Sequence, residues 1–264
     1  MKSKLNKIRC FLLDMDGTIY LGKKILPGAA EFLRKLDDSG KEYYFLTNNS
    51  SHDQDFYQRK LAKMGINTKK ERVIISSHSL LLYLENNAGK NIFVLGTQEL
   101  KDVFADAGYK IIETGGEKVD YVVVGFDTGL DFERLSIACQ YVDAGVPYVA
   151  THPDVRCPME GGKYIPDCGS ILALIKTSTG KECTMIAGKP SKYIVQIVAN
   201  KTGFAPSELA VVGDRLYTDI ALGENSGIFS ILVLSGEAKK EELVNSPYKP
   251  NLVLDGIYQL EKYI

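Results

Sequence analysis

The chain has 264 residues, a formal net charge of −1 and a hydrophobic fraction of 45%. This length suits one large domain or two smaller ones, and this apolar fraction is enough for a complete core. The balanced charge argues against a surface dedicated to nucleic acid, and no apolar stretch reaches the length of a membrane span.

The N-terminal segment and the cysteines point to a cytoplasmic protein. Residues 1–7 lack the apolar region of a signal peptide. The five cysteines are scattered and match no zinc-binding spacing. Because they lie within strand or helix patterns, we expect reduced, mostly buried thiols.

Short apolar runs alternate with helical patterns along the chain, which is typical of an α/β protein. We expect helices from Pro27 to about Gly40, from Asp53 to Met64, and from Pro190 onward. The expected strands are residues 8–13, 43–46, 73–75, 92–95, 121–124, 148–150, 184–187, 209–212, 230–234 and 252–254. Continuous apolar strands of this kind favour a parallel sheet that is buried on both faces.

Two acids follow the first expected strand, in the run Asp14-Met15-Asp16-Gly17-Thr18. In open α/β sheets, ligands bind beyond the carboxyl ends of the strands. The two carboxylates would repel each other unless a cation lay between them, and Mg²⁺ prefers such oxygen ligands. Gly17 permits a tight turn. The alternative is an acidic turn without a ligand.

A second polar cluster, Thr47-Asn48-Asn49-Ser50, follows the next strand. Its hydroxyl, amide and backbone N–H groups precede an expected helix and could hold phosphate oxygens. The alternative is an ordinary helix N-cap, for which Ser50 and Ser51 are both suitable.

Two further clusters follow later strands. Lys189 stands beside an expected helix N-terminus, where the helix dipole disfavours a cation unless an anion is near; otherwise it is a solvated surface lysine. Asp214 lies at a strand tip and Asp219 one turn into the next helix. Both acids could complete a magnesium site, although Asp214 could instead serve as a helix N-cap.

Taken in order, these four segments resemble the motifs of the haloacid dehalogenase superfamily of phosphohydrolases. The matching residues are Asp14-x-Asp16-Gly17-Thr18, Thr47, Lys189 and Gly213-Asp214-(x)₄-Asp219. The resemblance covers nearly the whole chain. It implies a Rossmann-like, doubly wound parallel sheet as the catalytic core.

The spacing of these motifs predicts where a cap domain is inserted. Residues 19–26 leave no room for one after the first motif. About 140 residues separate Thr47 from Lys189, far more than a sheet crossover requires. We therefore expect a core of residues 1–78 and 184–264 and an inserted α/β cap of residues 79–183.

The segment Thr151-His152-Pro153-Asp154 resembles the nitrophenylphosphatase-like branch of the superfamily, subfamily IIA. This branch includes pyridoxal phosphatases and phosphoglycolate phosphatases. It usually has Asn in place of His152 and Gly in place of Asp167 or Cys168. The resemblance implies a small phosphorylated metabolite as substrate, with no nucleic acid or membrane partner, and a homodimer through the cap is compatible with it.

The resemblance implies a Mg²⁺-dependent phosphatase that forms an aspartyl-phosphate. Asp14 would be the nucleophile, Asp16 the acid and base, and Lys189 a second positive charge. Thr47 and Asn48 would bind the phosphoryl oxygens. The implied metal residues are Asp14, Asp16 through its backbone carbonyl, Asp214, and Asp219, which would orient either Lys189 or a metal-bound water.

Residues 151–168 are the candidate specificity loop, with Arg156, Glu160 and Tyr164 as its expected substrate contacts. The alternative is a turn-rich surface connection. Competing functions are a dehalogenase, against which Asp16 argues, a phosphomutase with the same acids, and a non-catalytic phosphometabolite-binding protein. The intact nucleophile, lysine and metal acids argue against the last.

Overall fold

The computed structural model describes residues 5–159 and 162–264 and contains two compact units. The first unit comprises Met1–Thr47, Gln54–Ile74 and Lys189–Ile264; the second comprises Asn48–Asp53 and Ile75–Gly188. Within the described residues, no helix is both long enough and apolar enough to cross a bilayer. The cysteines at positions 10, 139, 157, 168 and 183 are all free.

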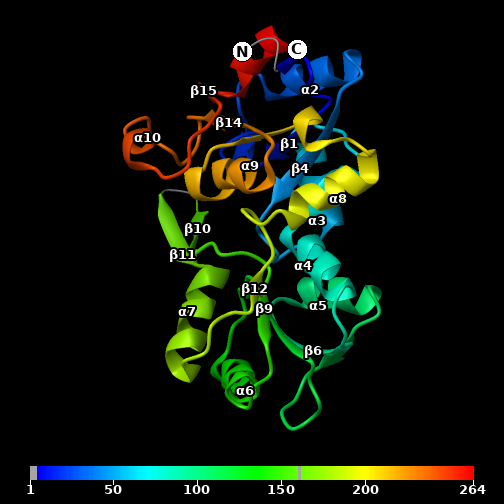
Figure 1. The fold of residues 1–264 in the computed structure, drawn as a ribbon, viewed down its shortest axis with the longest axis vertical. Helices are drawn as coiled ribbons and strands as arrows, with labels where there is room; N and C mark the ends of the chain where they lie inside the picture. Colours follow the sequence, from blue (N-terminus) through cyan, green and yellow to red (C-terminus); the bar gives the residue numbers. More distant parts are fainter. Residues whose placement is uncertain (1–4, 160–161) are drawn as a thin grey trace. The chain divides into compact units, whose positions relative to one another are not determined.

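The first unit is built on a six-stranded sheet in the order β15-β14-β13-β1-β4-β5 (Figure 1). Its strands are β1 (Cys10–Asp14), β4 (Glu42–Thr47), β5 (Val73–Ile75), β13 (Leu209–Gly213), β14 (Phe229–Val233) and β15 (Leu252–Leu254). The chain fills one side of β1 first and later returns to fill the other. The order of the strands therefore reverses between β1 and β13, and such a switch point places a crevice at the carboxyl ends of the strands.

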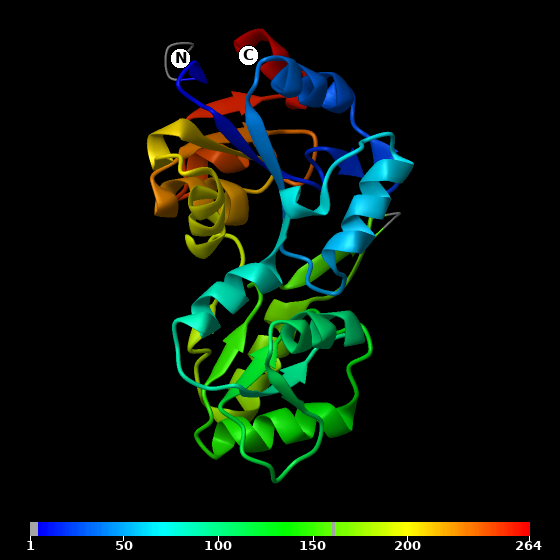
Figure 2. The same ribbon diagram turned by 90° about the vertical axis from the view of Figure 1, so that its right-hand side faces the viewer.

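Helices cover both faces of this sheet. The helical segments are α2 (Ala29–Asp38), α3 (Gln54–Lys63), η1 (Lys70–Arg72), α8 (Tyr193–Thr202), η2 (Pro206–Glu208), η3 (Leu216–Ile220), α9 (Ala221–Ser226), α10 (Glu242–Asn245) and η4 (Ile257–Tyr263). A small hairpin, β2 (Tyr20–Leu21) and β3 (Lys24–Ile25), follows the first motif. Figure 2 shows α8 and α9 on the opposite side of the sheet from α2 and α3.

Alternating side chains of β1 show why both faces are covered. Leu12 packs with Ile194 of α8 and Leu222 of α9 in one buried cluster. Phe11 points the other way and meets Phe32 of α2 edge to face, with ring centroids 5.7 Å apart. A strand buried on both faces needs a continuous apolar run, which is what residues 10–13 supply.

The second unit has its own five-stranded parallel sheet, in the order β12-β9-β8-β6-β7. Its strands are β6 (Asn91–Leu95), β7 (Lys110–Ile112), β8 (Tyr121–Val124), β9 (Tyr148–Ala150) and β12 (Met185–Ile186), with a separate antiparallel hairpin of β10 (Arg156–Met159) and β11 (Lys163–Pro166). Its helices are α4 (Ser76–Glu85), α5 (Gln98–Asp106), α6 (Phe132–Asp143) and α7 (Cys168–Thr179).

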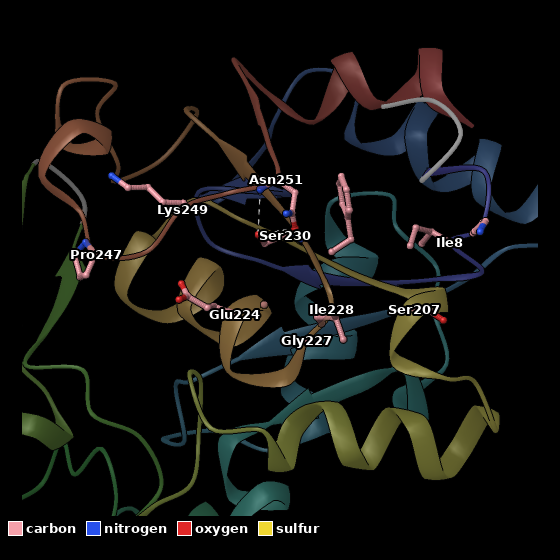
Figure 3. Close-up of a pocket in the computed structure, with 12 residues that line it drawn as sticks. Ile8, Ser207, Glu224, Gly227, Ile228, Ser230, Pro247, Lys249 and Asn251 are labelled. Atoms are coloured by element: carbon pink, nitrogen blue, oxygen red, sulfur yellow. Dashed lines mark hydrogen bonds between the residues drawn. The ribbon is translucent and has the colours of Figure 1, made fainter.

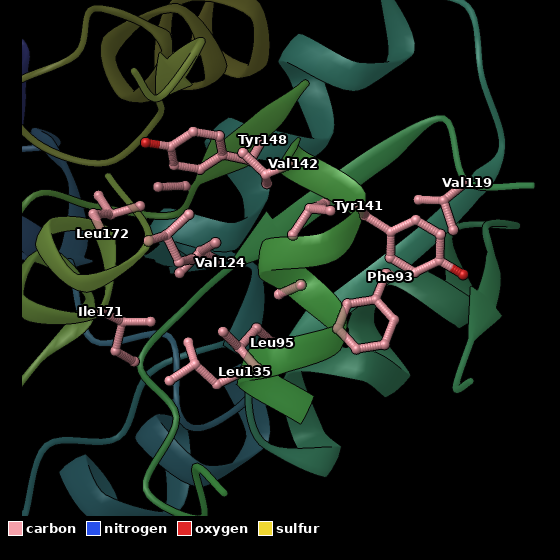
Figure 4. Packing of buried hydrophobic residues seen from close by; sticks show 14 of the residues in the cluster. Phe93, Leu95, Val119, Val124, Leu135, Tyr141, Val142, Tyr148, Ile171 and Leu172 are labelled. Carbon is pink, nitrogen blue, oxygen red and sulfur yellow. The ribbon is translucent and has the colours of Figure 1, made fainter. Parts of the chain in front are cut away.

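This second sheet also has a hydrophobic core on each face. One cluster joins Phe93 and Val124 to Leu135 of α6 and Ile171 of α7 (Figure 4). The other joins the opposite faces of the same strands to α4 and α5. With helices on both faces of two parallel sheets, the predicted α/β class is confirmed.

The structure changes some of the predicted boundaries. Helix α2 begins at Ala29, after Gly28 in a left-handed conformation, and not at Pro27. Helix α8 begins at Tyr193 and not at Pro190, because residues 189–192 form a turn that places Lys189. The compact units also divide the chain differently from the predicted domains, since the second unit extends from Ile75 to Gly188 and includes residues 48–53.

Candidate active site

The center of the site is a buried lysine held between two carboxylates. Asp14 is the last residue of β1, and Lys189 follows β12. The Lys189 Nζ donates a hydrogen bond to Asp14 Oδ1 and another, 2.7 Å long, to Asp219 Oδ1. Lys189 is only 3% exposed. A buried cation needs such partners to offset its desolvation, so the solvated-surface alternative for Lys189 is wrong.

Burial and charge act in opposite directions on these groups. Burial alone would lower the pKa of Lys189, but the neighbouring carboxylates of Asp14 and Asp219 raise it above its usual range. For Asp14, burial raises the carboxyl pKa and Lys189 opposes that rise. The ammonium therefore keeps its charge and favours the ionised form of Asp14.

Asp214 follows β13, the neighbour of β1, and is buried at the switch point of the sheet. Its Oδ2 accepts a 2.6 Å hydrogen bond from the backbone N–H of Glu237. Its Oδ1 is buried and has no hydrogen-bond partner among the described residues. Burial, followed by the charges of Asp14 and Asp219, raises the pKa of the Asp214 carboxyl well above its usual range. The simple N-cap alternative does not account for this orphaned oxygen.

These carboxylates fit a magnesium ion. Oxygen atoms of Asp14, Asp214 and Asp219 lie within 4.8 Å of one another. Hard cations bind such all-oxygen sets, and a bound cation would satisfy the orphaned Asp214 Oδ1. Two glycines let the backbone approach Asp214 closely, because a Cβ atom added at Gly17 or Gly236 would overlap its carboxylate.

Asp219 is engaged on both of its oxygens. Oδ1 accepts from Lys189, and Oδ2 accepts from the backbone N–H of Arg215 at 3.1 Å. Gly213 makes room for this side chain, because an added Cβ there would overlap the Asp219 carboxyl group. The geometry favours Asp219 as the residue that orients Lys189.

Asp16 and Thr47 also lie at the carboxyl ends of their strands. Asp16 keeps access to solvent, but desolvation by the surrounding protein raises the pKa of its carboxyl, against Lys60 and Arg215, which lower it. The turn after it is closed by a 2.7 Å hydrogen bond from the Gly17 N–H to the Tyr20 carbonyl. Thr47 ends β4, the other neighbour of β1.

The remaining predicted residues lie in the second unit. The side chain of Asn48 is buried and donates a 3.2 Å hydrogen bond from Nδ2 to Asp154 Oδ1. On the β10–β11 hairpin, the Arg156 guanidinium stacks over the Tyr164 ring, with its carbon 4.7 Å from the ring centroid. Glu160 lies outside the described residues.

The segment after β14 also contributes to the site, although no motif in the sequence pointed to it. The Ser235 hydroxyl donates to the Gly17 carbonyl at 2.7 Å, and the N–H of Glu237 holds Asp214. Residues 235–237 therefore support the two acid-bearing turns. The available signal was a Ser-Gly pair directly after an expected strand, the position at which the other clusters occur.

A separate cleft of about 510 Å³ occurs in the first unit (Figure 3). Residues at its wall precede or begin β1, β13, β14 and β15, among them Ile8, Ser207, Ser230 and Asn251. It therefore lies at the amino ends of the strands, the edge opposite to Asp14 and Asp214, and is distinct from the candidate site.

Comparisons with known proteins identify the family. Residues 11–110 match the family described as haloacid dehalogenase-like hydrolase, and residues 186–260 match a related HAD-hydrolase-like family. The chain is 31% identical to a 5'-nucleotidase of Bacillus subtilis (strain 168), over 96% of this chain and 98% of that protein.

Solved structures give the same result. A 4-nitrophenylphosphatase from Thermotoga maritima is 45% identical and has a TM-score of 0.93, with 98% of each chain covered. A glycerol phosphate phosphatase from Mycobacterium tuberculosis, in complex with magnesium, is 28% identical and has a TM-score of 0.91, with 99% of this chain and 79% of that chain covered. The protein thus belongs to the haloacid dehalogenase-like hydrolases of the nitrophenylphosphatase type and is a phosphatase of phosphate monoesters.

Proposed function

We propose that this protein is a Mg²⁺-dependent phosphatase of small-molecule phosphate monoesters that works through an aspartyl-phosphate on Asp14. The observation that carries the proposal is the pairing of Asp14 with Lys189 beside the orphaned oxygen of Asp214. This arrangement supplies a nucleophile, a fixed positive charge and a cation site at the carboxyl edge of one sheet. A solved relative in complex with magnesium supports the choice of ion.

In the first chemical step, a carboxylate oxygen of Asp14 forms a bond to phosphorus while the bond from phosphorus to the ester oxygen breaks. Asp16 gives its proton to the departing alkoxide. The raised pKa of the Asp16 carboxyl suits this role, because a larger fraction of the group then carries a proton near neutral pH.

In the second step, water attacks phosphorus and the bond to Asp14 breaks, which releases inorganic phosphate and restores the carboxylate. Asp16, now ionised, takes the proton from that water. Lys189 stabilises the charge on the phosphoryl oxygens, and Asp219 keeps its ammonium in place through their 2.7 Å hydrogen bond. Thr47 contributes a hydroxyl to the same oxygens.

Asp14, Asp214 and the backbone carbonyl of Asp16 would hold the magnesium ion, with Asp219 beside them. The ion supplies positive charge where two anions must meet. A carboxylate and a phosphoryl oxygen repel each other by about 4 kcal/mol at 4 Å and an effective dielectric of 20. The glycines at positions 17 and 236 keep space for the Asp214 carboxylate.

We propose that the second unit is the cap and that its β10–β11 hairpin selects the leaving group. Arg156 and Tyr164 stack on each other and remain exposed, so they offer a cationic and an aromatic surface to a substrate. The relatives act on different esters, as their names state: a nucleotide, nitrophenyl phosphate and glycerol phosphate. Different leaving-group contacts on such a cap would account for that diversity.

The proposal is tested by a screen of purified protein against a panel of phosphate monoesters, with phosphate release as the readout. We expect turnover of several small esters with Mg²⁺ present and loss of that turnover in excess EDTA. Asp14→Asn should reduce turnover by several orders of magnitude while its circular dichroism spectrum stays unchanged, with Asp38→Asn as the matched surface control. Full turnover in EDTA, or in Asp14→Asn, would refute the mechanism.

A further inference from the structure

The connection between β4 and α3 belongs to a different unit from the elements that it joins. Both β4 and α3 lie in the first unit, but residues 48–53, here called the 48–53 loop, belong to the second. The chain thus leaves the first unit immediately after Thr47. It returns for good between Gly188 and Lys189. Thr47 and Lys189, both assigned to phosphoryl transfer, are therefore residues of the first unit at which the chain passes to or from the second unit.

Hydrogen bonds fix the 48–53 loop to the carboxyl ends of the strands of the second sheet. The Ser50 hydroxyl lies 3.0 Å from the Thr151 hydroxyl and accepts a 3.0 Å bond from the Phe126 N–H. The Thr97 hydroxyl donates to the Ser51 carbonyl at 3.1 Å. These hydroxyl groups do not cap α3, which begins at Gln54, so their role is to anchor the loop.

Asn48 is the first residue of this loop and is held at both its backbone and its side chain. Its carbonyl accepts a 2.6 Å hydrogen bond from the Ser76 hydroxyl, and its Nδ2 donates to Asp154. Asn48 is 5% exposed and Asp154 is 6% exposed. A hydrogen bond to a buried carboxylate is among the stronger kinds in proteins.

The partner of Asn48 is itself firmly placed. The Asp154 carbonyl accepts a 2.8 Å hydrogen bond from the Gly169 N–H at the start of α7. The position of Gly169 requires glycine, because an added Cβ would overlap the Pro153 carbonyl. The same stretch of chain continues from Asp154 directly into β10 of the hairpin.

Gly188, the last residue of the second unit before Lys189, packs against Thr151 and Asn48. Its N–H donates to the Thr151 carbonyl at 2.6 Å, and an added Cβ would lie 2.7 Å from Asn48 Oδ1. The chain just after Thr47 and the chain just before Lys189 therefore share one packed cluster with the loop that leads to the hairpin.

We propose that Asn48 is a positioning residue and that its hydrogen bond to Asp154 sets the backbone that carries Thr47. Asp154 thereby links the base of the hairpin to Asn48, the residue that follows Thr47 in the chain. This inference rests on the phosphatase function proposed above and assigns the Asn48 amide a role other than contact with phosphoryl oxygens. Displacement of a reacting or binding group by about 1 Å costs on the order of 100-fold in rate.

A swap of the two side chains separates positioning from direct phosphate contact. Asn48→Asp places a carboxylate against Asp154 and should lower kcat by about tenfold to 100-fold, with a smaller effect on KM. In the double variant N48D/D154N, the new amide at position 154 can donate to the new carboxylate at position 48. We expect this variant to recover most of the lost kcat. The control Asn67→Asp, in the exposed loop between α3 and η1, should behave as wild type.

If the Asn48 amide touches the phosphoryl group, a carboxylate at position 48 repels that group whatever residue stands at 154. Failure of the swap to restore kcat in a variant that melts at the wild-type temperature would therefore overturn the proposal. If Asn48→Asp does not fold, the variants Asn48→Ala, Asp154→Ala and their double variant form an alternative double-mutant cycle. We then expect the double alanine variant to be no slower than the worse single variant, and additive losses would overturn the proposal.

The proposed function can fail separately from this inference. If the wild type hydrolyses none of the esters with Mg²⁺ present, the proposed function is wrong. The melting temperatures of Asn48→Asp and N48D/D154N should then still show the coupling of Asn48 with Asp154. If the wild type is active and neither cycle shows coupling, the positioning role of Asn48 is wrong and the phosphatase function stands.

Discussion

At the scale of single residues, the site depends on the close approach of like charges. Asp14, Asp214 and Asp219 lie together in a buried environment in which Lys189 is the cation bound to two of them. One ammonium offsets part of that negative charge. The orphaned Asp214 Oδ1 shows where further positive charge is needed, and the acids are therefore poised for a divalent ion.

This balance predicts how pH affects the stabilisation by Mg²⁺. The pKa of the Asp214 carboxyl is raised, so the metal-free fold binds a proton more tightly there than the unfolded chain does. Metal-free stability should then fall as pH rises above the usual carboxyl range towards that raised pKa. Mg²⁺ needs the ionised form, so it should raise the melting temperature more at pH 8 than at pH 5.

Differential scanning calorimetry with and without Mg²⁺ checks this expectation. Asp214→Asn should remove most of the Mg²⁺-induced shift at both pH values, because a charged oxygen ligand is lost. Asp38→Asn, at the exposed end of α2 before the amino end of β4, serves as the matched control. Equal shifts at pH 5 and pH 8 would show that these carboxylates do not bind the ion.

At the scale of elements, the proposed selection of substrates by the β10–β11 hairpin predicts an effect on specificity. Among the residues that the structure describes, its two strands pair only with each other, and Tyr164 is 54% exposed. Arg156→Ala removes the cation that stacks on this ring. Because contacts to a leaving group change transition-state binding differently for unlike esters, the ratio of their kcat/KM values should change severalfold.

The measurement compares nitrophenyl phosphate with glycerol phosphate in wild type, Arg156→Ala and the control Lys118→Ala. Lys118 precedes β8 at its amino end, whereas the hairpin follows the carboxyl end of β9. The control should keep the wild-type ratio. An unchanged ratio in Arg156→Ala would show that residues 156–166 are a surface connection without a role in substrate selection.

Strongly apolar elements were predictable from the sequence, and contact-dependent elements were not. All ten expected strands occur, because a continuous buried run has few alternatives, whereas β7 of the second sheet was not expected. The β10–β11 hairpin was missed, since its residues alternate little and include Pro158 and Pro166. Among the polar clusters, the sequence around Lys189 indicated a nearby anion. The pairing of Asn48 with Asp154 was not predictable, because the two residues are 106 positions apart and meet only in the folded chain.

At the scale of the whole molecule, the chain forms two units with separate sheets and separate cores. The carboxylates proposed to hold Mg²⁺, those of Asp14, Asp214 and Asp219, all belong to the first unit. Mg²⁺ alone should therefore slow amide hydrogen exchange in β1 and β13 and leave β6 and β8 unchanged. Hydrogen exchange with mass spectrometry at saturating Mg²⁺ checks this. Equal protection of both sheets would contradict a metal site confined to the first unit.

We expect Asp14 to carry the phosphoryl group during turnover, and trapping of this intermediate is the decisive experiment. The enzyme is mixed with nitrophenyl phosphate and Mg²⁺ and quenched in acid during steady turnover, and the peptide that contains Asp14 and Asp16 is analysed by mass spectrometry. We predict a phosphoryl group on Asp14 in the wild type and none in Asp14→Asn. An active wild type that shows no phosphorylated peptide, or a phosphoryl group on any other residue, would contradict the account.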